Sequence, residues 1–277
     1  MLIFEHQVVD GRIVYNLLMS ESLTTADVVR LIGKLESYIN ELRIIPATSF
    51  YRSKVLLALL SKCFTMSRAV CALVDAGFAA EAFGLSRTLI EVFLTVRYFT
   101  NDEYQAEKRA TRYVEYIAKT QQTLLQSAAK FFPEVLVSLK RRDEMQEMAE
   151  NYKNPHSWGD ERHLIRAMAL EKDAYEVDAV GEPIDQAFDY EFIYPQASFY
   201  VHATIHSLVN HMTENGEPFE IRANRLADVR ANQAVFNALA FPAKTVVCAF
   251  RGLKTEHRQE ILDEMYHFMA LSSRHGT

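Results

Sequence analysis

The sequence predicts a mainly α protein, a multi-helix bundle with an N-terminal β-hairpin. Only 9 glycines and 7 prolines occur in 277 residues, so few residues interrupt helices. Most of the chain repeats apolar residues at helical spacing, whereas its first residues are β-branched and aromatic around an Asp-Gly pair. We expect a single mainly helical domain over 1–277, with the hairpin in 1–20 and the bundle in 24–272.

The hairpin prediction rests on two apolar runs, LIFEHQVV and RIVYNLLM, that flank Asp10 and Gly11. Asp-Gly suits a type I′ turn, because both central residues of that turn need positive φ. Two strands alone are marginally stable in water. We therefore expect the hairpin to pack on the helical body or to pair with another chain.

The helices are expected in the following order along the chain. Thr24 or Thr25 can cap a first helix that runs to about residue 43. Further helices are expected over 49–75, 79–100, 103–130, 133–150, 161–171, 195–214, 226–251 and 255–272. Residues 151–161, which contain the only tryptophan, Trp158, and the acidic segment 172–193 are expected to be irregular.

Net charge, hydrophobic runs and cysteine content limit the kinds of protein that this chain can be. The net charge is −6 and the pI is about 5.9, which argues against a broad nucleic-acid footprint. No N-terminal signal peptide and no run of 18 uncharged apolar residues is present, so we expect a cytoplasmic protein with no membrane span. The three cysteines, Cys63, Cys71 and Cys248, lie in apolar helical text and are predicted to be reduced core residues.

The helix expected over 79–100 carries Arg87 and Glu91 one turn apart on a narrow polar arc. One interpretation is a solvated surface with a single ion pair contributing about 0.3–0.5 kcal/mol. The other is a bidentate pair in a polar cleft between helices, for which the planar guanidinium of arginine is suited.

The helix expected over 195–214 places Ser198 within its apolar arc and His202 at the edge of that arc. Both side chains are therefore expected to point inward or into a cleft. His202 is then either a core histidine satisfied by a neighbouring acceptor, or a general acid/base or phosphate donor. Trp158 and Tyr194 are further candidates for lining such a cleft.

Metal and cofactor sites are not predicted. His202 and His206 share a helix face, but no glutamate follows His202 as zinc-protease helices require. Residues 264–267 read E-x-x-H, and this motif occurs once where a di-iron bundle needs two. The glycine-rich nucleotide-binding loops and the G-x-S-x-G hydrolase motif are absent from the sequence.

A family resemblance follows from the S-R-T-L-I-E segment at 86–91 and the Y-x-x-x-S-x-x-x-H pattern of Tyr194, Ser198 and His202. Over about residues 50–215 the chain resembles the bacterial family of unknown function labelled DUF5677. The resemblance implies an all-helical domain with no settled activity. Its polar positions here are Arg87, Glu91, Tyr194, Ser198 and His202.

A second resemblance is to the HEPN superfamily, whose nuclease members use an R-x4-6-H motif at a dimer interface to cleave RNA without metal. Arg251 and His257 fit that spacing. The residue after the arginine is usually polar in that superfamily, whereas here it is Gly252.

Two hypotheses of different class follow from these patterns. The first is a HEPN-like protein acting on RNA or a nucleotide in a toxin or phage-defence setting, with histidine as acid/base and arginine stabilising phosphate charge. The second is a non-catalytic binding or regulatory module that self-associates into a homo-oligomer through the hairpin or a helical face, with a structural polar cluster.

Overall fold

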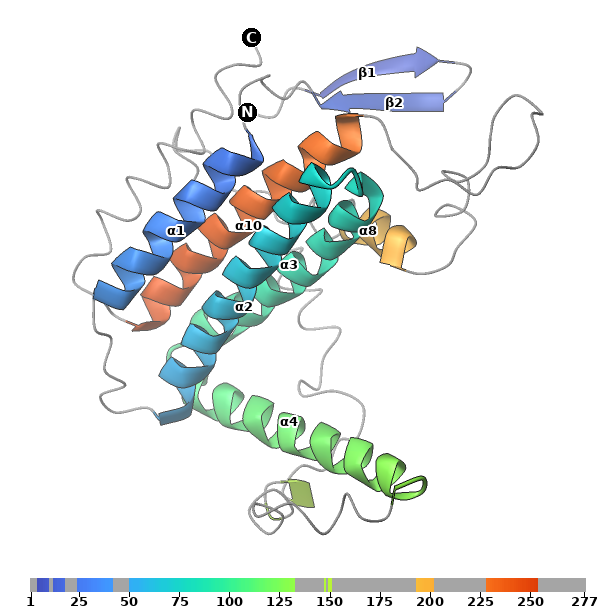
Figure 1. Cartoon of the computed structure of the whole chain (residues 1–277). Coiled ribbons are helices and arrows are strands. Elements are labelled where there is room, and N and C mark those ends of the chain that lie inside the picture. Colours follow the sequence, from blue (N-terminus) through green and yellow to red (C-terminus); the bar gives the residue numbers. More distant parts are fainter. Residues whose placement is uncertain are drawn as a thin grey trace.

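A computed structural model (Figure 1) describes residues 4–9, 12–17, 24–41, 50–132, 147, 149–150, 193–201 and 228–253. The mainly helical class is confirmed. The helices are α1 (Thr25–Glu41), α2 (Phe50–Asp75), α3 (Ala79–Thr100), α4 (Ala106–Ala129), α8 (Tyr194–Val201) and α10 (Asp228–Leu253). The predicted helices over 161–171 and 255–272, and most of the ones over 133–150 and 195–214, lie outside the described residues.

Helices α1, α2, α3 and α10 form a bundle around one apolar core. Its largest fully buried side chains include Phe83, Phe93, Phe99, Phe241 and Phe250. α3 and α10 lie side by side and run in the same direction, whereas α2 runs against both (Figure 1). The bundle thus joins helices from the first hundred residues to one that begins at Asp228.

The turn between α2 and α3 is set by Gly77, whose φ of 86° lies in the left-handed region that glycine adopts without steric cost. Its N–H donates to the Val74 carbonyl at 2.9 Å, and the N–H of Phe78 donates to the Leu73 carbonyl at 2.8 Å. This pairing closes the end of α2 as a Schellman motif. Because glycine is the usual residue at this position of the motif, the sequence alone could predict where the helix breaks.

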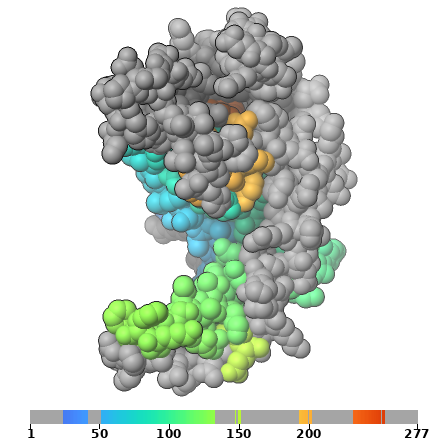
Figure 2. Space-filling view, turned by 90° about the vertical axis from the view of Figure 1, so that its right-hand side faces the viewer, coloured from blue at the N-terminus to red at the C-terminus, as the bar shows by residue number. Residues whose placement is uncertain are grey.

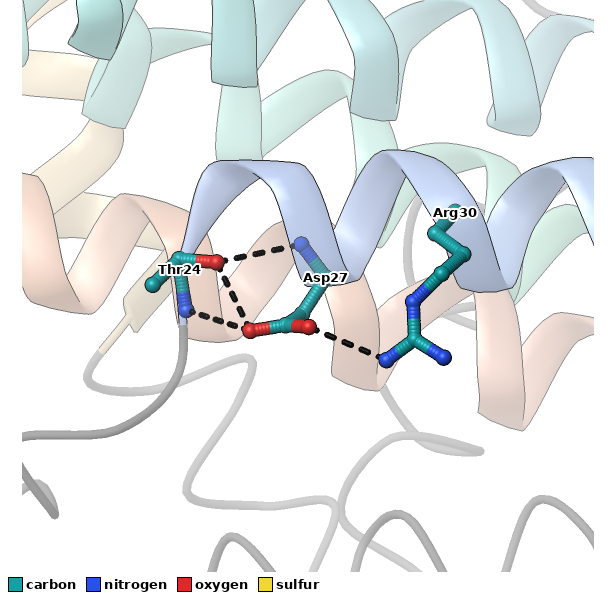
Figure 3. Close-up of polar contacts among 3 residues, drawn as sticks. All are labelled: Thr24, Asp27 and Arg30. Atoms are coloured by element: carbon teal, nitrogen blue, oxygen red, sulfur yellow. Dashed lines mark hydrogen bonds and ion pairs between the residues drawn. The ribbon is translucent and has the colours of Figure 1, made fainter.

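The start of α1 confirms Thr24 as its N-cap (Figure 3). The Asp27 N–H donates to the Thr24 hydroxyl oxygen at 3.2 Å, and the Thr24 hydroxyl donates to Asp27 Oδ2 at 2.7 Å. Arg30 donates to Asp27 Oδ1 at 3.0 Å. The hydrogen bonds from Thr24 and then Arg30 hold the pKa of Asp27 below its ordinary value.

α4 leaves the lower end of the bundle at an angle (Figure 1). Its first turn is fixed by Glu107, whose carboxylate accepts hydrogen bonds at 3.4 Å from the backbone N–H groups of Tyr51 and Arg52. Arg109 donates to the Tyr98 carbonyl at 2.6 Å and lies over the Tyr98 ring. The base of α4 is therefore tied to both α2 and α3.

The N-terminal strands β1 (Phe4–Val9) and β2 (Arg12–Leu17) run antiparallel, with Phe4 opposite Leu17 and Val9 opposite Arg12. Within the described part of the chain, these two strands form the only sheet. A two-stranded ribbon is marginal unless its side chains pack on a core. The hairpin as a stable part of the fold therefore stays a prediction, as do the domain boundaries.

The three cysteines are buried and free of disulfide bonds, as the sequence predicted. Burial raises the pKa of Cys63 to about 12 and that of Cys71 to about 11. Among the residues that the structure describes, two helical segments are long and apolar enough to cross a membrane, Tyr51–Asp75 and Ala231–Phe250. The apolar 18-residue window of the first is 50% buried inside the protein, and that of the second is 83% buried. Core helices of soluble proteins have the same composition, so these windows do not determine where the protein resides.

Candidate functional site

The outward face of α3 carries the predicted pair. Arg87 Nε lies 3.1 Å from Glu91 Oε1, one helical turn away. The Arg87 side chain is 26% exposed and that of Glu91 is 49% exposed. The pair is thus neither stranded in the core nor wholly solvated, and the recorded contact runs through Nε to a single carboxylate oxygen.

Tyr194, the first residue of α8, completes this group from 103 positions further along the chain. Its hydroxyl donates to Glu91 Oε1 at 3.0 Å. Its ring lies beneath the guanidinium, with Arg87 Cζ 5.1 Å from the ring centroid. Arg87 and Tyr194 therefore donate to the same oxygen. We call Arg87, Glu91 and Tyr194 the Glu91 cluster.

α8 packs against α3 at Gly84. A Cβ at Gly84 would lie 3.5 Å from both Tyr200 Cβ and Val201 Cγ2, so α8 approaches the α3 backbone closely here. The Tyr200 ring meets Phe83 edge-on, with centroids 5.7 Å apart. Ala197 is fully buried between these contacts. α8 thus crosses α3 in the opposite direction, with Tyr194 at Glu91 and Tyr200 at Gly84.

The protonation states of the two donors are fixed near neutral pH. Burial first, and then the charge of Glu91, raise the pKa of Tyr194 above its ordinary value of 10.0. Burial lowers the pKa of Arg87, but the hydrogen bond to Glu91 and the negative charges around it outweigh burial and raise it. Both groups therefore remain hydrogen-bond donors, and neither releases a proton at neutral pH.

Ser198 is half-buried, as its place within the apolar arc predicted. Its hydroxyl donates to the Tyr194 carbonyl at 2.8 Å, four residues back in the same helix. A serine used in this way supports the local backbone and is not held toward the carboxylate of Glu91.

The other predicted site residues are not placed by the structure. His202, Trp158 and His257 lie outside the described residues, and for Arg251 only the backbone, within α10, is described. Among the residues that are described, His, Cys, Asp and Glu side chains do not gather in groups of three that could hold a metal ion.

Two features of this region escaped the sequence analysis. Gly84, which shares the polar side of its helix with Arg87 and Glu91, is buried beneath α8. Asn237 of α10 donates to the Ser86 hydroxyl at 3.0 Å, and both residues are buried. An asparagine flanked by apolar residues on both sides was the available signal for this contact, but its partner is 151 residues away.

The comparison with known families concerns this region of the chain. The family of unknown function DUF5677 matches residues 53–219. The chain belongs to DUF5677. The match confirms the predicted resemblance and includes α2, α3, α4 and α8, and therefore the whole Glu91 cluster. No curated protein and no solved structure matches the chain.

The DUF5677 match leaves the HEPN resemblance without support, and Gly252 has a packing role of its own. A Cβ on Gly252 would lie 2.7 Å from Thr100 Cγ2 and 2.9 Å from Leu56 Cδ1. Its carbonyl accepts a hydrogen bond from Arg52. The glycine after Arg251 is therefore explained by close contact between α10 and its neighbours.

Proposed function

We propose that this DUF5677 protein is a non-catalytic binding or regulatory module, in which the Glu91 cluster holds α8 on the face of α3. The observation that carries the proposal is that Tyr194 and Arg87 donate to the same Glu91 oxygen, at 3.0 and 3.1 Å. The hydrogen bond and the cation–π contact both span the α3–α8 contact. The cluster is therefore a structural contact that holds α8 against α3.

The chemistry of the cluster favours this role over catalysis. A general acid or base works best with a pKa near the operating pH. The pKa of Tyr194 is raised from 10.0 and that of Arg87 from 12.5, so both move further from neutrality. Both donors are directed at Oε1 of Glu91, so their polar hydrogens are used within the cluster.

The competing hypothesis is an enzyme that acts on RNA or a nucleotide in a toxin or phage-defence setting. It requires His202, or Arg251 with His257, as the reacting groups. Inducible expression in a bacterial host separates the two hypotheses. We expect the wild type to leave growth and total RNA unchanged, and purified protein to leave RNA intact. Growth arrest with RNA cleavage that His202→Ala or His257→Ala relieves would overturn the proposal.

A stability measurement tests the architectural role directly. Neutralising a strained functional site often raises stability, whereas breaking a structural contact lowers it. We therefore expect Arg87→Ala to lower the melting temperature. Lys62→Ala, at an exposed position of α2, controls for loss of a long cationic side chain. A higher melting temperature for Arg87→Ala would indicate a functional site and would contradict the structural role of the Glu91 cluster.

We also propose that the protein resides in the cytoplasm. The apolar window of α10 is 83% buried within the bundle, as expected of a core helix. Recovery of the protein in the membrane fraction after high-salt washing would refute this location.

A further inference from the structure

We propose that one face of α4 pairs antiparallel with the same face of a second copy of this chain. The face, which we call the α4 seam, consists of Val114, Ile117, Gln121, Leu124 and Ala128, together with Phe131 in the turn that follows the helix. This inference deepens the proposed function, because it names the surface through which a non-catalytic module would self-associate. It rests on a different helix and on different observations from the Glu91 cluster.

The first observation is the exposure of large apolar side chains along this face. Ile117 is 39% exposed, Leu124 63% and Phe131 78%, and the neighbouring Phe132 is 57% exposed. A large side chain offers about 150–250 Å² for burial, so these four expose on the order of 400 Å² of apolar surface. Patches of that size on a monomer often mark an interaction site.

The second observation is spacing. The seam positions alternate steps of four and three residues from Val114 to Phe131, and the same steps lead back to the buried Ala110. Such a heptad pattern forms a straight stripe of the kind that packs helix against helix. α4 has 24 residues, which gives a length of about 36 Å. Gln121 is the single polar residue in the seam, and a residue of this kind can set the register of a helix pair.

The charge pattern permits two identical faces to meet. Residues 120–129 carry no charged side chain. The charges that flank this segment, Glu115, Lys119 and Lys130, occupy positions off the seam, and Lys119 donates to Gln122 at 3.3 Å. Two copies of α4 can therefore approach without placing like charges opposite each other.

The antiparallel orientation follows from side-chain size and from the shape of the molecule. In that register Phe131 lies opposite Val114, Ala128 opposite Ile117, and Leu124 opposite Gln121, so each bulky residue meets a smaller or more flexible one. A parallel pair would instead set Phe131 against Phe131 and Ala128 against Ala128. α4 projects from the body (Figure 2), so a two-fold antiparallel pair leaves the two bodies at opposite ends.

The seam supplies a large part of the area that a dimer interface needs. A stable interface needs about 800 Å² per partner. The four large side chains supply roughly half of that area. The exposed Gln121 and the half-buried Leu125 and Ala128, which lie on or beside the seam, add to this area, whereas Val114 already packs against the core of its own chain.

The first experiment measures the mass of the full chain by size-exclusion chromatography with light scattering at tens of micromolar protein. We expect the wild type at about twice the chain mass of 31.8 kDa. Leu124→Glu should convert it to the monomer, whereas Gln126→Glu, which adds the same charge opposite the seam, should remain dimeric. Circular dichroism checks that both variants keep the wild-type helix content.

Several outcomes of that experiment would overturn the inference. A monomeric wild type would do so, and so would a dimer that Leu124→Glu leaves intact. If Leu124→Glu fails to fold, Phe131→Ser in the turn after α4 provides the same test. A monomeric wild type that leaves host RNA intact would reject the seam and leave the non-catalytic role standing, so the two proposals fail separately.

Disulfide trapping tests the orientation. Ile117→Cys and Ala128→Cys lie opposite each other in the antiparallel pair, so we expect oxidation to cross-link them only when the two single variants are mixed. Two copies of the same new cysteine would be about 16 Å apart, too far for a disulfide. The three native thiols are buried and do not compete. Cross-linking of either variant with itself would indicate a parallel pair and refute the proposal.

Discussion

Replacing Tyr194 with phenylalanine removes a single hydroxyl group from the Glu91 cluster and keeps the ring beneath Arg87. The lost contact is the 3.0 Å hydrogen bond to Glu91 Oε1. The cation–π contact, with Arg87 Cζ 5.1 Å from the ring centroid, remains. The substitution therefore removes the polar contacts of the hydroxyl, which also interacts with Arg87, and keeps the contact of the ring.

The expected cost follows from the environment of the acceptor. A hydrogen bond to a charged group contributes about 1.5–3 kcal/mol when it is shielded from water. The Glu91 side chain is 49% exposed, and solvent competes for the carboxylate. We therefore expect Tyr194→Phe to lower the free energy of unfolding by about 1 kcal/mol. For a chain of this size that change lowers the melting temperature by about 2–4 °C.

Urea unfolding of the wild type, Tyr194→Phe, Glu91→Ala and the double variant gives the coupling energy between the two side chains. We expect a coupling of about 0.5–1 kcal/mol. Tyr104→Phe is the matched control, because the Tyr104 side chain is 97% exposed, and it should not change stability.

If Tyr194→Phe unfolds at the same urea concentration as Tyr104→Phe, the Tyr194 hydroxyl does not stabilise the fold. The same conclusion follows if the effects of Tyr194→Phe and Glu91→Ala add with a coupling below about 0.3 kcal/mol. Either result would mean that the Tyr194 hydroxyl exchanges Glu91 for water at no cost, and that other contacts hold α8.

Three further predictions concern pH and reactivity. Because the pKa of Tyr194 is raised above 10.0 in the folded state, the unfolded chain loses this proton first as pH rises, so stability should fall above about pH 10, and less in Tyr194→Phe. Thr24→Ala should cost about 1 kcal/mol at pH 7 through loss of the α1 cap. Because the pKa of Asp27 is lowered in the folded state, this carboxylate stabilises the protein at pH values above its ordinary pKa of 3.8. In urea titrations, the cost of Thr24→Ala should therefore shrink as the pH falls through the lowered pKa. A cost that does not change with pH would contradict this assignment. Burial raises the pKa of Cys63 to about 12 and that of Cys71 to about 11. Both thiols should therefore resist iodoacetamide at pH 8 until urea unfolds the protein. Rapid labelling of the native protein would show that the core opens.

Local signals explain which parts of the fold were predictable. The helix expected over 79–100 coincides with α3, because Gly77 ends the preceding helix and apolar residues recur at helical spacing. α10 continues to Leu253, past the predicted end at residue 251, because Gly252 sits in a tight contact with Leu56 and Thr100 that requires no side chain. That contact comes from distant segments, so the sequence showed a helix-breaking residue but not the packing that retains it.

The candidate site shows the same division. Spacing placed Arg87 and Glu91 on one face, and the family resemblance added Tyr194, but nothing local showed that Tyr194 would donate to Glu91. That contact depends on α8, a distant segment, packing against α3 at Phe83 and Gly84. A helical wheel identifies a polar arc, but it does not show which part of the arc another helix covers.

The position of α10 in the bundle has a consequence for synthesis of the protein. α3 ends at Thr100, and α10, which packs between α1, α2 and α3, begins at Asp228. At about 5–20 residues per second, a ribosome needs roughly 6–25 s to make the intervening chain. During that interval the apolar faces of α2 and α3 have left the ribosome without their final neighbour. Nascent chains of this protein should therefore require chaperone protection until the last quarter of the sequence emerges.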